Sequence, residues 1–428
     1  MSHNETTGTR CLSPCPKSEV VMQRVVFLVD MNAFFISCET TRHPELAGKP
    51  AAVAGDPKTR SGIILAANYE ARRFGIKTTM TLNEARKLCP NIILVPPDHH
   101  FYELKSSEVM KILSGYSPVI EQASIDEAWL DMTGCENLFG QPRTTAESIM
   151  KDIGDQLGLW CSIGIAGNKF LAKMASEMKK PLGITELWMG DIAGKLWPLK
   201  VQAMYGIGKQ TAERLSHMNI LTIGDLAAIN PVLLADKLGK TAVELHQRAN
   251  GIDDSPVTPH VSDEMKSIGR STTLPKDVTE LEEARKVIME LSEDIAMTAR
   301  HHCKKGRTVQ ITIKYNDFKV ITRQLGIAPT NLARDIMQAG IELLSGNWNN
   351  HRPVRLLGVS LSGFEEDHPE QISLFDQANS ASPSKKEEKL EEALDDIRRK
   401  FGSDKVGRAS LVNSPSRHRR QPPQGGSQ

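Results

Sequence analysis

Two short apolar runs that meet at a pair of adjacent acids constrain the fold of this chain more than any other feature. The stretch PVIEQASIDEAWLDMTG, residues 118–134, predicts a strand, a turn at Asp126 and a second strand. Residues 100–116, 144–158 and 168–180 carry apolar side chains at helical spacing. Paired strands among helices predict an α+β protein, with an antiparallel sheet and helices on one face, rather than a doubly wound parallel sheet.

The adjacent acids Asp126 and Glu127 raise a conflict with strand geometry. Neighbouring side chains of a strand point to opposite faces, so the two carboxylates share a site only if the turn breaks the alternation. The apolar run VVFLVD, residues 25–30, predicts a buried strand whose end would place Asp30 beside them. A solvated turn with two ordinary acids is the alternative interpretation, and the pair alone does not exclude it.

Three clustered carboxylates favour a metal site. They repel one another unless cations neutralise them, and hard oxygen ligands of this kind suit Mg²⁺. Two such ions form a recurrent device for in-line phosphoryl transfer. A binding site for a triphosphate would come from two predicted helices. Tyr69 and Arg72 lie three residues apart on one of them, and Lys169 lies at the start of the other. Each of these residues alone also fits an ordinary surface position.

Two further segments suggest contact with a nucleic-acid backbone. Gly206, Gly208 and Lys209 form a Gly-x-Gly hairpin whose N–H groups and ammonium could bind a phosphate, although a tight helical turn explains it equally well. Residues 300–323 hold seven Lys or Arg and a single acid, and a predicted strand there alternates. Its polar face, which includes Lys314, could track a nucleic-acid backbone, or could be a plain solvated face.

Composition limits the class and the compartment. The 428 residues are 39% hydrophobic and 25% charged, with a formal net charge of +1, which is typical of a soluble globular protein. Seven scattered cysteines without paired CxxC motifs argue against zinc and for a reducing compartment. The sequence has neither an apolar run of about 20 residues nor a signal peptide. We therefore expect a cytoplasmic protein without a membrane span.

The C-terminal part, from residue 364, is rich in Ser, Pro, Gln and charge, and predicts a flexible tail. Within it, QISLFD (371–376) exposes an apolar pair that could enter a hydrophobic pocket, or could be only a sticky linker. Further on, apolar residues recur at helical spacing, in a segment that could bind a partner or fold back. They are Leu390, Leu394, Ile397 and Phe401.

Several motifs occur together in the order of one known family. DMNAFF (30–35), YEAR (69–72), SIDEA (124–128), GNKFLAK (167–173) and GIGKQTAERL (206–215) make the chain resemble the Y-family translesion DNA polymerases, close to the bacterial DNA polymerase IV group. The resemblance covers residues 24–376. Asn32, where many members have Asp, and EQAS before Asp126 depart from the family pattern. An inactive DNA-binding factor would lack one of the three carboxylates, and a nucleotide cyclase would not need the Gly hairpin.

The resemblance implies a role for each motif. Two Mg²⁺ ions would be held by the three carboxylates and a backbone carbonyl, and Glu127 would also assist activation of the primer 3′-hydroxyl. The implied metal ligands are Asp30, Met31, Asp126 and Glu127. Tyr69, Arg72 and Lys169 would bind the incoming triphosphate, and Phe35 would exclude ribonucleotides. Primer–template DNA would contact Gly206, Gly208, Lys209 and Lys314, whereas Gln371, Leu374 and Phe375 would dock on a sliding clamp.

The implied fold is a right hand in a monomeric enzyme that uses DNA and deoxynucleoside triphosphates. Its parts follow a disordered leader, residues 1–21. They are a catalytic palm (22–33 and 99–186), small fingers (34–98), a thumb with a helix-hairpin-helix (187–256), a linker (257–264), an α/β little finger (265–363) and the tail (364–428).

Overall fold

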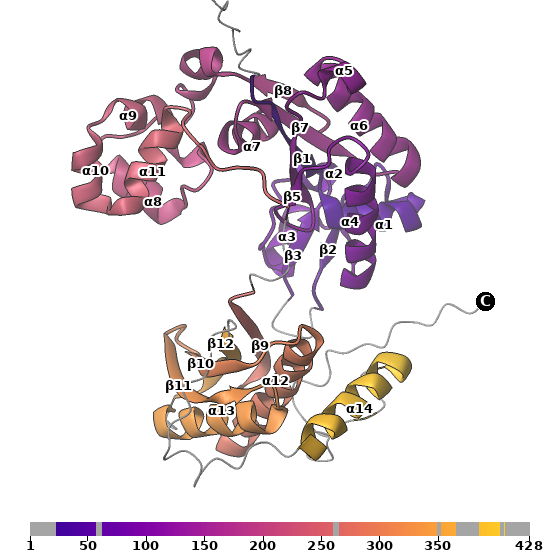
Figure 1. Ribbon diagram of the computed structural model, residues 1–428, viewed down its shortest axis with the longest axis vertical. Helices are drawn as coiled ribbons and strands as arrows, with labels where there is room; N and C mark the ends of the chain where they lie inside the picture. The colour runs from indigo at the N-terminus through magenta and orange to yellow at the C-terminus, as the bar shows by residue number, and fades with distance from the viewer. Residues whose placement is uncertain are drawn as a thin grey trace, which may run out of the picture. The chain divides into compact units, whose positions relative to one another are not determined.

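The computed structural model describes residues 23–56, 62–259, 265–348, 352–364, 385–402 and 406 (Figure 1). Its contacts divide the chain into two compact units. The first unit comprises residues 1–51, 66–70 and 97–260, and the second unit comprises residues 52–65, 71–96 and 261–428. The predicted leader, residues 1–21, and the clamp motif, residues 371–376, lie outside the described residues, as do residues 260–264 of the predicted linker.

The first unit is built on a five-stranded sheet of order β5-β6-β1-β7-β8. Its strands are β1 (Val26–Met31), β5 (Ile120–Gln122), β6 (Glu127–Asp131), β7 (Cys161–Ala166) and β8 (Ile184–Leu187). The helices around it are α1 (Phe34–Arg42), α4 (His99–Leu113), α5 (Glu136–Phe139), α6 (Pro142–Leu157) and α7 (Lys169–Met178), with a 3₁₀ turn at Pro44–Leu46. The β5–β6 hairpin and its antiparallel neighbour β1 confirm the predicted α+β sheet.

Helices cover both faces of this sheet, so the prediction that they cover one face is wrong. Phe27 and Val29 face a core that includes side chains of α4 and α6. Val26 and Leu28 face the opposite way, into a core that includes side chains of α7. All six residues of β1 are buried, as expected for a strand covered on both faces. In addition, β7 and β8 run parallel, so the sheet is not wholly antiparallel.

Short helices follow the sheet, as the sequence predicts. They are a π-helix (Ile192–Leu196), α8 (Lys209–Ser216), α9 (Ile223–Ala228), α10 (Pro231–Leu238) and α11 (Lys240–Ala249), with 3₁₀ turns at Met189–Asp191 and Val201–Ala203.

A smaller sheet of order β3-β2-β4 comprises β2 (Ala51–Ala54), β3 (Ile64–Ala67) and β4 (Ile93–Val95). The helices α2 (Tyr69–Arg73) and α3 (Leu82–Leu88) lie between β3 and β4 in the sequence.

The C-terminal half of the second unit is an antiparallel sheet of order β11-β10-β12-β9. Its elements are β9 (Ser267–Val278), α12 (Leu281–His301), β10 (Gly306–Tyr315), β11 (Val320–Thr330), α13 (Ala333–Asn347) and β12 (Val354–Phe364). Val309, Ile311 and Ile313 are buried with side chains of α12 and α13, which confirms the predicted alternation of β10. The opposite face carries Thr308, Gln310, Thr312 and Lys314, each half-buried.

Residues 385–401, part of the predicted flexible tail, form the helix α14 (Lys385–Phe401), drawn in yellow in Figure 1. The helical spacing of its apolar residues is thereby confirmed. Within the described residues, none of the helices combines the length and the apolar character that crossing a bilayer requires.

Candidate active site

Asp30, Asp126 and Glu127 lie at one end of the paired strands β1 and β6. Asp30 is opposite Glu127 in the antiparallel register, and the N–H of Met31 donates to the carbonyl of Asp126 at 2.9 Å. The N–H of Ala123 donates to the carbonyl of Glu127 at 2.9 Å, which closes the turn between β5 and β6. Both adjacent acids therefore lie where the hairpin turns, as the conflict in the sequence required.

Asp126 differs from the other two carboxylates in its hydrogen-bond partner. The Ser124 hydroxyl donates to its Oδ1 at 2.6 Å, and the side chain is half-buried. Among the described residues, no three Asp, Glu, His or Cys side chains converge closely enough to hold a metal ion.

Two lysines neutralise the carboxylates. The Nζ of Lys173, on α7, lies 3.0 Å from Oδ2 of Asp30 and 2.8 Å from Oε1 of Glu127. The Nζ of Lys180, just after α7, lies 2.8 Å from the same Asp30 oxygen. Glu177 accepts from both ammonium groups, at 2.9 and 2.8 Å. Sequence reasoning missed Lys173 and Lys180, although the spacing of Lys173 and Glu177 places them on one helical face.

The close approach of α7 to the sheet puts these lysines over β1. A Cβ atom on Gly164 of β7 would lie 1.9 Å from the carbonyl oxygen of Ala172 and 2.5 Å from the nitrogen of Ser176. Only glycine allows the backbones of strand and helix to come so near. The resulting contact fixes the rotation of α7 and aims Lys173 at Asp30.

The pKa values of these groups follow from burial and neighbouring charge. Burial raises the pKa of Glu127, and the hydrogen bond and charge of Lys173 offset this only in part. Burial lowers the pKa of Lys173, but the charge of Asp30 and the hydrogen bond to Glu127 outweigh it and raise the pKa overall. Burial also raises the pKa of Glu177, yet hydrogen bonds from Lys180 and Lys173 prevail and lower it.

Lys169 is the first residue of α7, as predicted, and its role in triphosphate binding stays a prediction. Its Nζ contacts both carboxylate oxygens of Glu121, at 2.6 and 2.7 Å, and lies 4.5 Å from the ring centroid of Trp129. The same Glu121 accepts from the N–H of Thr258 at 2.9 Å. The structure therefore joins Lys169 to the segment 251–258, which we call the strap, and not to Asp30, Asp126 or Glu127.

Further bonds hold the strap along the first unit. Asn168 donates to the carbonyl of Gly251 at 2.8 Å, and the N–H of Phe170 donates to Asp253 at 3.0 Å. Arg24 donates to the carbonyl of Ser255 at 2.8 Å. The first residues of α7 thus fix the path of the chain towards the predicted linker, whereas later residues of the same helix reach the carboxylates.

Phe35 lies on α1, beside β1, the strand that carries Asp30. Its ring stacks on Tyr102, with centroids 4.5 Å apart and planes inclined by 14°, and Tyr102 is held by a 2.6 Å hydrogen bond to Glu39. A half-buried ring with one face fixed in this way can act as a rigid wall. Tyr69 and Arg72 lie on α2, half-buried and exposed respectively, and their triphosphate role stays a prediction.

Asn32 has a structural role. Its buried side chain donates to the Ser162 hydroxyl at 3.0 Å and accepts from the N–H of Leu182 at 2.9 Å. The amide thereby ties the end of β1 to β7 and to the segment after α7. An amide can both donate and accept here, which an ionised carboxylate at the same position could not do.

The predicted DNA contacts lie in two places. Gly206 has a φ of 93°, which favours glycine, and Gly208 precedes α8. Lys209, the first residue of α8, has a side chain 82% exposed, and Lys314 extends from β10 over the ring of Phe318. The proposed clamp residues Gln371, Leu374 and Phe375 lie outside the described residues.

Known proteins share sequence and fold with this chain. The impB/mucB/samB family matches residues 29–177, and the impB/mucB/samB family C-terminal domain matches residues 265–374. A DNA polymerase IV of Clostridium kluyveri is 62% identical over 395 residues, covering 91% of this chain and 99% of its own. One of Alkaliphilus oremlandii is 57% identical, covering 91% and 100%. A solved Y-family DNA polymerase chimera gives a TM-score of 0.68 at 28% identity, covering 79% of this chain and 99% of its own.

The chain therefore belongs to the impB/mucB/samB family and has the fold of the Y-family DNA polymerases. It is a DNA-directed DNA polymerase of the DNA polymerase IV type, which serves translesion synthesis in DNA repair and replication. The sheet with Asp30, and the β9–β12 sheet with α12 and α13, are consistent with the palm and the little finger of that fold.

Proposed function

We propose that the polymerase joins a deoxynucleotide to a primer 3′-hydroxyl at Asp30, Asp126 and Glu127, with two Mg²⁺ ions. The observation that carries this proposal is the position of Lys173, whose ammonium lies between Asp30 and Glu127. The two carboxylates thus balance the positive charge of the Lys173 ammonium at that point, and hard carboxylate oxygens are the ligands that Mg²⁺ prefers. Asp126 and the carbonyl of Met31 would complete the set of ligands.

The side chains around this point would bind and orient the substrates. Magnesium, when bound, lowers the pKa of the attacking hydroxyl and balances the charge of the leaving pyrophosphate. Glu127, whose pKa is raised by burial, is suited to receive the hydroxyl proton. Lys180, with its side chain 22% exposed, is better placed than Lys169 to leave Asp30 and contact a triphosphate. Tyr69 and Arg72 would bind the same triphosphate.

Other residues would contact the sugar of the incoming nucleotide and the DNA duplex. Phe35 would stand against the 2′ position of the incoming nucleotide. Gly206, Gly208 and Lys209 would contact the phosphates of primer–template DNA, as would Lys314. We assign the palm to residues 22–33 and 99–186, the fingers to 34–98, the thumb to 187–256 and the little finger to 265–363. We further propose a cytoplasmic monomer.

Primer extension with a single dNTP tests the catalytic assignment. Asp126→Asn and Glu127→Gln should each abolish extension while leaving DNA affinity in a gel shift nearly unchanged, because other parts supply most phosphate contacts. Glu136→Gln, on the exposed face of α5, is the matched control and should extend primers normally. Robust extension by either active-site variant would refute the assignment of the metal ligands.

The tail carries a separate proposal, that Gln371, Leu374 and Phe375 dock on a sliding clamp. Replacing both Leu374 and Phe375 with Ala removes two apolar anchors, each worth about 1.5–3 kcal/mol on burial. Clamp-stimulated extension should then fall to the unstimulated level, and extension without clamp should not change. Normal stimulation of the double variant would show that the clamp contact lies elsewhere.

A further inference from the structure

Helix α14 contacts the little finger through charged side chains. Arg334 of α13 binds both carboxylate oxygens of Glu387, at 2.6 and 2.7 Å, and Lys305 binds Glu388 at 3.0 Å. Nearer the end of the helix, Arg398 lies 3.2 Å from Glu293 of α12. These residues recur along one face of α14, so the pairs form a continuous row and not isolated surface contacts.

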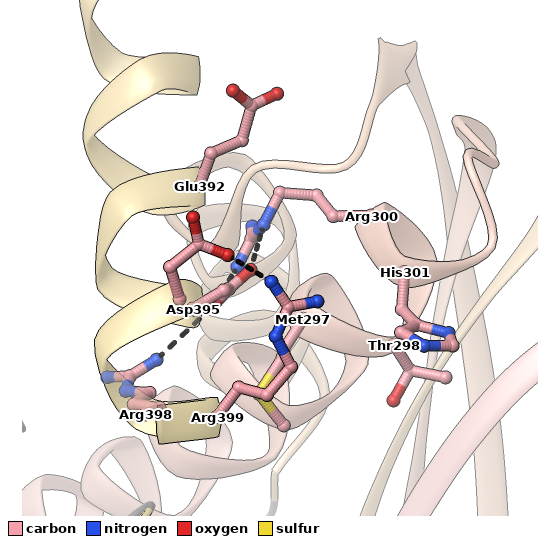
Figure 2. Close-up of a pocket in the computed structure, with 9 residues that line it drawn as sticks. Met297, Thr298, Arg300, His301, Glu392, Asp395, Arg398 and Arg399 are labelled. Carbon is pink, nitrogen blue, oxygen red and sulfur yellow. Dashed lines mark hydrogen bonds and ion pairs between the residues drawn. The ribbon is translucent and has the colours of Figure 1, made fainter. Parts of the chain in front are cut away.

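The centre of this row is a built carboxylate site on the little finger. Arg300 of α12 reaches Asp395 through two nitrogens, at 2.7 and 3.1 Å (Figure 2). It also binds Glu391. The N–H of Ala333, the first residue of α13, donates to the same Glu391 at 3.2 Å. A side chain only 9% exposed and a helix N-terminus thus converge on carboxylates from α14.

Apolar burial contributes little to this contact. Among the described side chains of α14, none of the apolar ones is buried, and Leu390 and Phe401 are 60% and 59% exposed. The core of the little finger is formed by its own strands with α12 and α13. A cavity of about 500 Å³ separates part of α12 from α14, lined by Met297, Thr298 and His301 on one side and Glu392, Asp396 and Arg399 on the other.

We propose that Arg300, Lys305, Arg334 and the N-terminus of α13 form a binding surface for an acidic helix, and that α14 is its ligand, held by charge and released by salt. Because α14 adds nothing to the apolar core, its release leaves the little finger folded. The surface recognises carboxylates at helical spacing, which α14 supplies at 387, 388, 391 and 395. This inference does not depend on the proposed catalytic residues or on DNA binding.

Amide hydrogen exchange of the full chain, at about 0.05 M and about 1 M NaCl, tests the proposal. At the higher concentration the screening length falls to about 3 Å, which weakens the half-exposed pairs of Lys305 and Arg334 more than the buried pairs of Arg300. Most of the stability of a helix in a protein comes from tertiary packing, so a released α14 loses protection. We expect exchange in 387–401 to accelerate at least about tenfold, and exchange in α12 and α13 to change less than about twofold.

Two neighbouring aspartates give a matched pair of variants. Asp395 binds Arg300, whereas Asp396 pairs with Arg399 within α14 itself. Asp395→Arg and Asp396→Arg change the net charge of the helix equally. At low salt, the first should accelerate exchange in α14 about tenfold or more, and the second less than about twofold. Equal effects of the two, or protection that does not respond to salt, would overturn the proposal.

A charge swap separates docking from helix propensity. Arg334→Glu leaves the sequence of α14 untouched, yet should accelerate its exchange about two- to fivefold, because Arg334 and Glu387 are both about half exposed. Adding Glu387→Arg should restore protection. If Arg334→Glu alone has no effect on α14, or if the double variant stays unprotected, the helix is not held by this surface.

Discussion

The Nζ of Lys180 lies 2.8 Å from Oδ2 of Asp30, although 150 residues separate the two along the chain. Lys173 lies 3.0 Å from the same oxygen, so one buried carboxylate meets two ammonium groups. In the function proposed above, Asp30 is also a ligand of Mg²⁺. The lysines and a metal would compete for the same oxygens, which leads to measurable consequences for stability and for catalysis.

Lys173→Ala should destabilise the metal-free enzyme. It removes one partner of a buried pair, which leaves charge uncompensated and costs about 3–5 kcal/mol. Thermal melts in a chelator measure the loss, and Mg²⁺ should restore more stability to the variant than to the wild type. Lys151→Ala, which breaks an exposed pair on α6, is the control and should melt like the wild type. A variant as stable as the wild type in chelator would contradict the compensating role of Lys173.

Glu127→Gln should stabilise the metal-free enzyme at neutral pH. Folding raises the pKa of Glu127 above its ordinary value of 4.5, so its ionised form disfavours the folded state. The difference in free energy of unfolding between variant and wild type should be greatest above the pKa of Glu127 in the folded state. It should vanish as the pH falls below 4.5, where the carboxyl is protonated in both the folded and the unfolded state. Denaturant unfolding at several pH values measures this.

Glu177→Gln is the control for this prediction, because we expect it to change the free energy of unfolding in the opposite direction. Folding lowers the pKa of Glu177, so its carboxylate stabilises the fold above its ordinary pKa, and that stability is lost as the pH falls through the lowered value. The substitution should therefore destabilise the enzyme at neutral pH and have no effect in strong acid. The same sign for both substitutions at neutral pH would mean that amide geometry, and not charge, decides the outcome.

Lys180→Ala and Lys169→Ala should differ in their effect on nucleotide binding. A charged hydrogen bond contributes about 1.5–3 kcal/mol, so losing Lys180 should raise the KM for a dNTP about tenfold or more. Lys169 is paired with Glu121, and its loss should leave that KM nearly unchanged while loosening the strap. Steady-state incorporation of one nucleotide distinguishes the two variants. The reverse order would support the triphosphate role that the sequence suggested for Lys169.

Phe35→Ala should admit ribonucleotides. The ring is braced by Tyr102, so it cannot easily move away from a 2′-hydroxyl, and removing it opens the space. We expect the ratio of rNTP to dNTP incorporation to rise at least about tenfold, which corresponds to about 1.4 kcal/mol. Phe101→Ala, a neighbouring aromatic of the core, controls for general loosening of the palm. An unchanged ratio would make Phe35 a packing residue only.

The sequence by itself determined the local elements. The turn at Asp126 and Glu127, the β5–β6 hairpin and the alternation of β10 follow from patterns within a few residues. Such patterns act through backbone propensity and side-chain period, and need no distant partner. The motifs likewise identified the family, because they combine residue types that one chemistry requires.

Only the tertiary structure decided which charges meet. Lys169, Lys173 and Lys180 look alike in the sequence, yet only Lys173 and Lys180 reach Asp30, whereas Lys169 pairs with Glu121. The partners of α14 are also distant, with 91 residues between Arg300 and Glu391. Apolar periodicity determines which face of an element is buried, but it does not specify the angle at which that element packs. Long charged side chains find their partners only after that angle is fixed.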